Sequence, residues 1–336
     1  MEKQFLLFRA KFRDLTPRQW RLVAVVTIVT VAVMLLVRSR QTVGPIGLPP
    51  HFSGLGMFSY QEIALGLKPR AFARRAAQLG LTFVIVKAND GRTWGTKVHG
   101  RWTPQFDQSV PAAFHRAGLR CYGYGTTRLK PLQIDQRAVD PVPMQVQYAI
   151  KVLHLGADGY VFDDVFLTSQ GYRRDYAERL FGEVRQHVDT CRGCRGKVVA
   201  FSTFPHLWRR RGLPWDVAIQ HCHYFLPQSY WRTHRKTPEG ELHYTQQQWD
   251  RYGAERLDQS VELISHQRGA SRIACTVIPT AHTFVARTPA EGAELERFLK
   301  TAYPHYRGVA IFRWGITDPE TWPVVKRWGW KWRERR

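Results

Sequence analysis

From about residue 54 to the C-terminus, short apolar segments alternate with amphipathic ones, and this alternation constrains the fold more than any other feature. The apolar segments predict strands over residues 55–60, 83–88, 120–125, 160–163, 198–202, 223–228, 273–279 and 308–314. The amphipathic segments predict helices over 69–79, 106–117, 143–155, 173–188, a short piece near Leu207, 245–267, 289–302 and 319–328. Strands that alternate strictly with helices favour a parallel sheet with right-handed crossovers.

Eight such units in roughly 280 residues fit an α/β fold of the (β/α)8 TIM-barrel type, which typically takes ~250 residues. A doubly wound open sheet is the alternative. Neither a G-x-G-x-x-G nor a G-K-[ST] loop follows any predicted strand, which argues against nucleotide binding of those kinds. We therefore predict a barrel over residues 53–330, followed by a short basic tail at 331–336.

The N-terminal region predicts a membrane anchor. Residues 1–21 carry six basic side chains against Glu2 and Asp14, and an apolar run over residues 22–37 follows, broken only by Thr27 and Thr30. As a helix this run spans about 24 Å, close to the ~30 Å hydrocarbon core. The apolar part of a cleaved signal peptide is the alternative, but no A-x-A-like site follows, so we predict an uncleaved signal-anchor helix. The basic flank predicts a cytoplasmic N-terminus, and residues 38–52 form a Pro/Gly linker to an outward-facing barrel.

The net charge of +23 implies attraction to a polyanion: nucleic acid, anionic lipid or an acidic polymer of the cell envelope. Because no recognised nucleic-acid motif is present and the barrel is expected outside the cytoplasm, the sequence argues against nucleic acid. Cys191-Arg-Gly-Cys194 is a C-x-x-C motif without a second ligand pair at similar spacing. We therefore predict no metal and no cofactor, and interpret this motif as a local disulfide.

Two carboxylates, Asp163 and Asp164, stand where a predicted strand ends, and in barrel enzymes the C-terminal ends of the strands carry the chemistry. Side chains alternate along a strand, so Val161 and Asp163 share one face. Val161 suits a barrel interior, and we expect Asp163 to point inward. By the same alternation Lys87 faces the interior, and we expect it to pair with Asp163 and hold that carboxylate ionised.

Carboxylates, aromatic rings and amides around one barrel mouth suggest a carbohydrate site. Glycoside hydrolysis usually needs two carboxyl groups, and the candidates are Asp163 or Asp164 together with Asp90. The predicted substrate-binding side chains are Lys87, Tyr124, Gln228, Tyr230, Trp231, His282 and Trp314. The alternatives are a turn cap and a solvated carboxylate for the Asp-Asp pair, and core packing for each aromatic residue.

Four segments resemble the strand pattern of family 25 glycoside hydrolases, which are lysozyme-like muramidases: Gly56-Met-Phe-Ser-Tyr-Gln61, Phe83-Val-Ile-Val-Lys-Ala-Asn-Asp-Gly91, Ala117-Gly-Leu-Arg-Cys-Tyr-Gly-Tyr124 and Asp158-Gly-Tyr-Val-Phe-Asp163. Later segments are similar to a group of uncharacterised bacterial barrel domains related to them: Phe201-Ser-Thr-Phe-Pro205, Leu226-Pro-Gln-Ser-Tyr-Trp231 and Gly308-Val-Ala-Ile-Phe-Arg-Trp-Gly315. The resemblance implies a barrel that cleaves a polysaccharide such as peptidoglycan. It assigns site positions to Asp90 and Asp163.

The sequence also departs from the family 25 pattern. Met57 and Phe58 stand where that family carries an Asp at the end of the first strand, and Val165 stands where its Asp-x-Glu motif has the Glu. Asp164 is then the remaining substitute for the usual acid. Two functions follow as hypotheses: an active envelope glycoside hydrolase, or a catalytically silent barrel that binds glycan or polyanion.

Overall fold

The computed structural model describes residues 49–163, 173–203, 214–230, 236–237, 240–241, 275–285, 288–289, 292–315, 317 and 319–335. They belong to the second of two compact units, Met1–Gly47 and Leu48–Arg336. The predicted anchor at residues 22–37 and the predicted helix at 245–267 lie outside the described residues. Within the described ranges, no helix combines the length and the apolar character that crossing a bilayer requires.

The centre of the second unit is a parallel sheet of nine strands in the order β13-β10-β9-β8-β5-β2-β1-β17-β14. These strands are β1 (Gly54–Ser59), β2 (Phe83–Asn89), β5 (Arg120–Thr126), β8 (Gly159–Asp163), β9 (Val198–Thr203), β10 (Tyr224–Pro227), β13 (Thr276–Val277), β14 (Thr280–His282) and β17 (Gly308–Phe312). All but β14 overlap a predicted strand.

The two ends of this sheet meet. β13 pairs with β10 and β14 pairs with β17, yet only Ile278 and Pro279 separate β13 from β14. The two short strands are thus halves of one segment, and the backbone N–H of Ser229 donates to the carbonyl of Thr280 across 3.0 Å beside them. The sheet therefore curls into a closed ring, and the prediction of an α/β barrel-like fold is confirmed.

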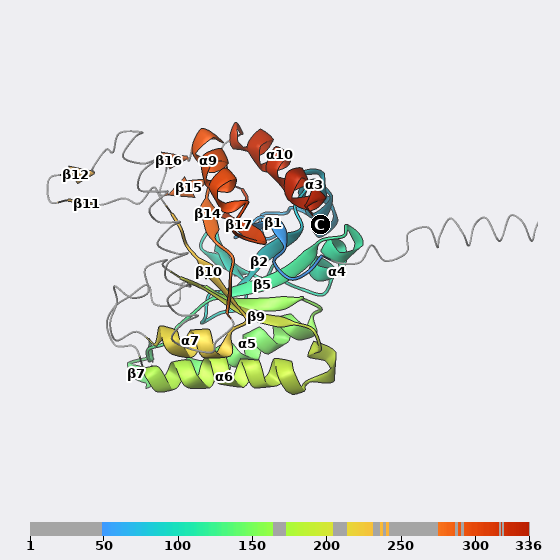
Figure 1. Ribbon diagram of the computed structural model, residues 1–336. Helices are drawn as coiled ribbons and strands as arrows, with labels where there is room; N and C mark the ends of the chain where they lie inside the picture. Colours follow the sequence, from blue (N-terminus) through green and yellow to red (C-terminus); the bar gives the residue numbers. More distant parts are fainter. Residues whose placement is uncertain are drawn as a thin grey trace, which may run out of the picture. The chain divides into compact units, whose positions relative to one another are not determined.

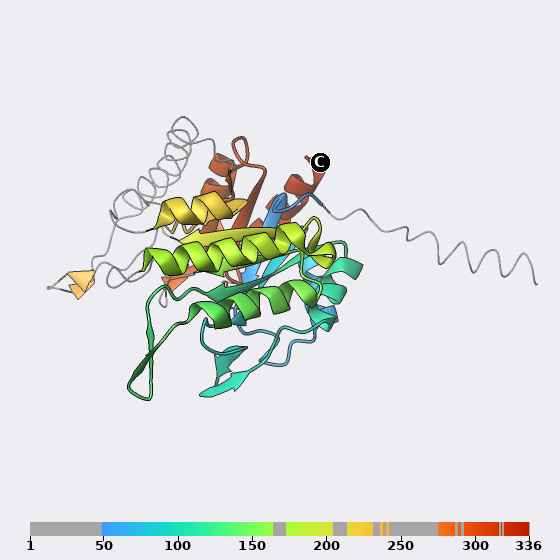
Figure 2. The same ribbon diagram turned by 90° about the horizontal axis from the view of Figure 1, so that it is seen from below.

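Helices cover the outside of this sheet: α3 (Pro69–Gln78), α4 (Ser109–Arg116), α5 (Val142–His154), α6 (Arg174–Thr190), α7 (Trp215–His221), α9 (Gly292–Ala302) and α10 (Thr321–Glu334). Figure 1 shows α3, α9 and α10 on one side of the barrel and α5, α6 and α7 on the opposite side. Seen from below in Figure 2, α5, α6 and α7 lie side by side along the sheet. The predicted alternation of strands and helices is confirmed over the described residues. The short helical piece predicted near Leu207 lies outside the described residues.

Short hairpins extend the loops of the barrel. β3 (Thr96–Val98) pairs with β4 (Arg101–Thr103) after β2, and β6 (Leu132–Ile134) pairs with β7 (Arg137–Val139) after β5. Two further two-residue pairs are β11 (Lys236–Thr237) with β12 (Gly240–Glu241), and β15 (Phe284–Val285) with β16 (Thr288–Pro289). The strands of these hairpins are only two or three residues long, too short for hydrophobic periodicity to predict them.

The apolar side chains form two layers, as strand alternation requires. An inner cluster fills the barrel and includes Phe58, Ile85, Tyr122, Tyr124 and Val161. An outer cluster lies between the sheet and the helices. Asp163 follows Val161 by two residues on β8, so its side chain belongs to the inner face, as predicted from the sequence.

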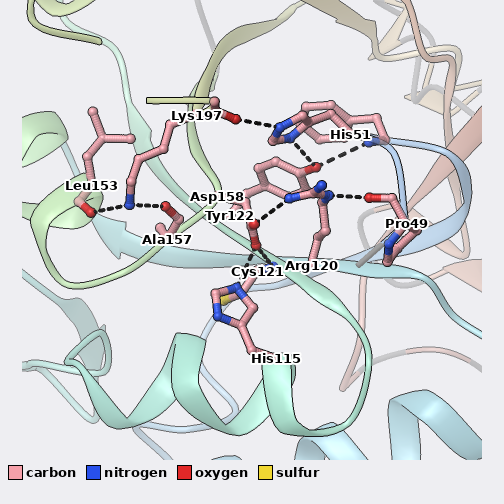
Figure 3. A network of polar contacts seen from close by, with 12 residues as sticks. Pro49, His51, His115, Arg120, Cys121, Tyr122, Leu153, Ala157, Asp158 and Lys197 are labelled. Atoms are coloured by element: carbon pink, nitrogen blue, oxygen red, sulfur yellow. Dashed lines mark hydrogen bonds and ion pairs between the residues drawn. The ribbon is translucent and has the colours of Figure 1, made fainter. Parts of the chain in front are cut away.

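Asp158 organises the N-terminal end of the barrel (Figure 3). Its carboxylate accepts hydrogen bonds from His115 at 2.7 Å, from Arg120 at 2.6 Å and from the backbone N–H of Cys121 at 2.7 Å. Burial alone would raise the pKa of Asp158, but the hydrogen bond and charge of His115, together with Cys121 and Arg120, outweigh burial and lower it. This network lies before β8, at the end of the barrel where barrel folds keep residues for stability rather than chemistry.

The last helix is part of the barrel. In α10, Trp328 and Trp332 are buried, with 4% and 2% of their surfaces exposed. The predicted basic tail at 331–336 therefore begins inside a helix that ends at Glu334. The backbone of α10 also approaches Gly80, which has φ +75° and where an added Cβ would lie 2.5 Å from the backbone nitrogen of Trp330.

Candidate functional site

Asp163 is held at the C-terminal end of β8 by its neighbours in the barrel. The side-chain amide of Gln228 donates to Asp163 Oδ1 across 3.3 Å and to Ser202 Oγ across 3.3 Å. These three side chains are all buried, and they come from β8, from β9 and from the residue after β10. Three successive strands of the sheet thus present a carboxylate, an amide and a hydroxyl at one mouth. The sequence predicted Asp163 and Gln228 for this site but did not select Ser202.

Tyr124 lies on the inner face of β5 with 1% of its surface exposed. Its hydroxyl has no hydrogen-bond partner among the described residues. Burial raises the pKa of Tyr124 well above its usual range, the negative charges of Asp163 and Glu62 raise it further, and Arg313 opposes them. The phenol therefore stays protonated at neutral pH. Because an unpaired buried hydroxyl is costly, this group is suited to bond a ligand.

Glu62 is a carboxylate that the sequence analysis missed. It is 8% exposed, and its Oε2 accepts hydrogen bonds from the hydroxyl of Ser59 at 2.5 Å and from the backbone N–H of Gln61 at 3.1 Å. Its charge acts on Tyr124 together with that of Asp163. The available signal was its position three residues after the end of β1, at the same mouth as the other strand ends.

Two cations at the mouth share one aromatic partner. Lys87 Nζ lies 4.1 Å from the ring centroid of Tyr60, and the guanidinium carbon of Arg313 lies 4.4 Å from the same centroid. The inward direction predicted for Lys87 holds, since it follows Ile85 of the inner cluster by two residues. The predicted ion pair with Asp163 was wrong, because the ammonium group takes a cation–π contact with Tyr60 instead.

Asp90, the predicted second carboxylate, takes part in a local turn. Its Oδ1 accepts hydrogen bonds from the backbone N–H groups of Arg92 at 2.9 Å and Thr93 at 2.7 Å. This arrangement is the capping that Asp commonly provides in loops. Its use as a catalytic group stays a prediction, and the other predicted carboxylate, Asp164, lies outside the described residues.

The predicted aromatic residues have different places. Trp314, which was predicted to contact sugar, is 4% exposed and belongs to the outer cluster, 4.6 Å between ring centroids from Phe72 and 4.8 Å from Trp322. Its contact with sugar stays a prediction. Trp314 lies beyond the end of β17, where the alternation that places Ala310 and Phe312 on the inner face no longer holds. Trp231 lies outside the described residues.

Tyr230 and His282 are brought together from different strand ends. Their ring centroids are 5.2 Å apart in an edge-to-face arrangement, and Tyr230 also lies 5.9 Å from Phe312. His282 is fully buried at the end of β14, beside β17. These rings form an aromatic cluster next to Gln228, which follows β10.

A separate group of side chains is suited to a metal, away from this mouth. His154, His187, Cys191 and Cys194 place one ligand atom each within 4.8 Å of one another. Two histidines thus lie beside the C-x-x-C motif, at a spacing along the chain that the sequence pattern did not reveal. Both cysteines are free thiols in the structure, rather than the predicted disulfide.

Comparison with known proteins bears on the fold. No family model matches the chain, and no curated protein matches it. Among solved structures, the chain is similar to fungal β-1,4-galactanases, with a TM-score of 0.50 and 11% identity over 78% of this chain and 88% of theirs.

The chain is less similar to the glycoside hydrolase domain of PgaB (BpsB) from Bordetella bronchiseptica, with a TM-score of 0.48 and 12% identity over 81% of this chain and 95% of that one. It has the same TM-score of 0.48 with the Bacillus cereus spore cortex-lytic enzyme SleL, at 8% identity over 81% of this chain and 73% of that one. At such identities the galactanase likeness shows the fold alone. The chain therefore has a barrel-like α/β fold of a kind found among glycoside hydrolases.

Proposed function

We propose that this protein is a membrane-anchored glycoside hydrolase that acts on a cell-envelope polysaccharide such as peptidoglycan. The observation that carries the proposal is the inner face at the barrel mouth. There the side-chain amide of Gln228 donates to the Asp163 carboxylate, and the hydroxyl of Tyr124, on the same inner face, has no hydrogen-bond partner among the described residues. A carboxylate, an amide and a free hydroxyl donor around one mouth match the groups that bind and cleave glycosidic bonds.

In this proposal Asp163 is the central carboxylate. Glu62 is the favoured second carboxyl group, because it is a buried carboxylate that follows β1 at the same mouth. One of the two would protonate the leaving oxygen, and the other would act as nucleophile or base. Asp90 and Asp164 remain the sequence-based alternatives for the second group.

The binding roles follow from the side chains at the mouth. Tyr124 and Gln228 would bond sugar hydroxyls, and Tyr230, packed against His282, would stack on a sugar face. Lys87 would contribute a positive charge near the carboxylates, and Trp231 is retained as a stacking residue on sequence grounds. The acetamido and hydroxyl groups of an envelope glycan suit this mixture of donors, acceptors and aromatic rings.

The location is proposed from the sequence. Residues 22–37 would anchor the chain with its N-terminus in the cytoplasm, and the net charge of +23 would draw the outward-facing barrel to acidic envelope polymers. Protease added to intact spheroplasts should digest the barrel if it faces outward. Digestion that occurs only after lysis would contradict this orientation.

The function is tested by release of reducing ends from purified peptidoglycan and a panel of envelope polysaccharides, using the full-length chain in detergent. The wild type should release reducing ends from at least one substrate, and Asp163→Asn should not. Asp107→Asn is the matched control, because Asp107 is an exposed carboxylate at the start of α4. Equal activity of the wild type and Asp163→Asn would refute the assignment of Asp163.

A second candidate is a catalytically silent barrel that binds glycan or another polyanion. Val165, at the place of the family 25 Glu, favours it. Co-sedimentation with insoluble peptidoglycan separates the two functions: binding without release of reducing ends would establish the silent barrel. Absence of both binding and release would contradict both.

A further inference from the structure

The C-terminal ends of α5 and α6 bring four classical metal-binding side chains to one place. His154 is the last residue of α5, and His187 and Cys191 stand four residues apart at the end of α6. Residues four apart on a helix share a face. The short 3-10 turn η1 (Arg192–Cys194) then returns the chain so that Cys194 joins them, with its backbone N–H donating to the carbonyl of Cys191 at 2.9 Å.

The distances suit a single tetrahedral ion. The Nε2 atoms of His154 and His187 are 3.1 Å apart, and all four ligand atoms lie within 4.8 Å of one another. Zinc bonds of ~2.0–2.1 Å to nitrogen and ~2.3 Å to sulfur give tetrahedral edges of roughly 3.3 Å between nitrogens and 3.8 Å between sulfurs. The nitrogen pair thus already has the required separation, and the remaining atoms need to move by about 1 Å at most.

A disulfide between Cys191 and Cys194 would explain why the two cysteines lie together, but not why the two histidines lie beside them. It would leave unexplained why two imidazoles from different helices point their Nε2 atoms at each other beside the same sulfurs. Two protonated imidazoles would repel at 3.1 Å, and two neutral ones must adopt complementary tautomers. A metal cation bound to both Nε2 atoms removes the repulsion and the need for complementary tautomers. The two negative charges of the thiolates neutralise a divalent ion, and the two imidazoles bind it in their neutral form.

The surroundings favour a structural ion. Cys194 is fully buried, and Lys197 Nζ, from the same turn, donates to the carbonyls of Leu153 and Ala157 at 2.7 Å each. The turn after α6 is therefore already tied to the end of α5. A site with four protein ligands is closed to substrate, which is typical of structural rather than catalytic zinc.

We propose that His154, His187, Cys191 and Cys194 bind one structural Zn²⁺ that joins α5, α6 and η1 at the N-terminal end of the barrel. Tetrahedral coordination by two sulfurs and two nitrogens selects zinc among the common divalent metals. This site is independent of the proposed hydrolase function, because it lies at the opposite end of the barrel from the strand ends that carry Asp163.

The test measures metal directly. The full-length chain is purified under a non-chelating reductant, and its zinc content is determined by mass spectrometry after acid release. We expect one zinc per chain, and loss of most of it in His154→Ala and Cys191→Ser. Matched controls are His305→Ala, an exposed histidine elsewhere, and Cys275→Ser, a half-buried thiol elsewhere; both should keep the metal.

Replacement by Co²⁺ gives a second readout that does not involve activity. Tetrahedral coordination with thiolates should give intense visible d–d bands and a thiolate-to-cobalt charge-transfer band, both lost in Cys194→Ser. His154 is exposed, so His154→Ala should fold normally. A loss of metal in this variant can then be attributed to the missing ligand rather than to unfolding. Zinc content equal in the wild type and in His154→Ala, or a reduced wild type that takes up neither metal, would overturn the proposal.

Discussion

The side-chain amide of Gln228 donates a hydrogen bond to Asp163 Oδ1 across 3.3 Å, joining residues that are 65 positions apart in the chain. The two residues follow β10 and end β8, which flank β9 in the sheet. An asparagine at position 163 retains the oxygen that accepts this bond but loses the charge. The pair therefore allows the carboxylate chemistry to be separated from the structural contact.

Asp163→Asn should lower kcat by roughly 100- to 10,000-fold, the usual contribution of an acid–base group. The Tm should stay close to that of the wild type, since Gln228 keeps its acceptor. Steady-state release of reducing ends and thermal unfolding measure the two effects. If Asp163→Asn loses activity only because the variant is unfolded, the result would contradict a chemical role for Asp163.

The second carboxylate can be identified by three parallel substitutions, Glu62→Gln, Asp90→Asn and Asp164→Asn. We expect Glu62→Gln to lower kcat by a factor similar to that of Asp163→Asn, because both charges act on Tyr124. Asp90→Asn should be nearly silent, since an asparagine oxygen can still accept the backbone N–H bonds of Arg92 and Thr93. Full activity in Glu62→Gln with loss in Asp90→Asn would restore the pairing predicted from the sequence.

Tyr124→Phe should leave stability unchanged or slightly higher, because the buried hydroxyl that it removes has no protein partner in the described structure. If that hydroxyl bonds the substrate, kcat/KM should fall about tenfold, equivalent to about 1.4 kcal/mol, the size of one hydrogen bond. Tyr122→Phe is the contrasting control. The Tyr122 hydroxyl bonds His51 and the backbone of Phe52 at 3.1 Å each, so its loss should lower Tm instead.

Asp158 predicts a dependence of stability on pH. Its pKa is lowered in the folded protein, so its contribution is fully present above the unfolded value of about 3.9 and is lost as the pH falls through the folded pKa. Asp158→Asn should cost about 3 kcal/mol of unfolding free energy at pH 7, because His115 and Arg120 lose a buried ionic partner. Urea titrations of both proteins at pH 7 and below pH 4 should show this difference shrinking in acid. If the difference in unfolding free energy between the two proteins is the same at both pH values, the loss comes from packing rather than from the charge of Asp158.

Gly80 predicts how closely α10 must pack. Gly80→Ala adds a Cβ 2.5 Å from the backbone nitrogen of Trp330 in a conformation with φ +75°, and should cost about 2–4 kcal/mol. Gly100→Ala is matched, because Gly100 has φ +80° and nothing within 4 Å of an added Cβ. It should cost about 1 kcal/mol, from backbone conformation alone. Chemical denaturation measures both, and equal losses would mean that α10 can shift away from Gly80.

The sequence by itself determined the barrel and the direction of two inner side chains. Alternation along the strands placed Asp163 and Lys87 on the inner face, since the period of two is a local property of the backbone. Their partners depend on neighbouring strands. Lys87 therefore contacts the ring of Tyr60 rather than the expected Asp163, and strand alternation did not reveal that Trp314 packs against Phe72 and Trp322.

Only the tertiary structure brought together side chains that are distant in the chain. Glu62 joins the charges that act on Tyr124 because β1 lies two strands from β5 in the sheet. His154 meets His187 and the Cys191–Cys194 turn because α5 packs beside α6. A linear spacing rule cannot find such groups, since helix packing and sheet closure, not separation along the chain, set the distances between their atoms.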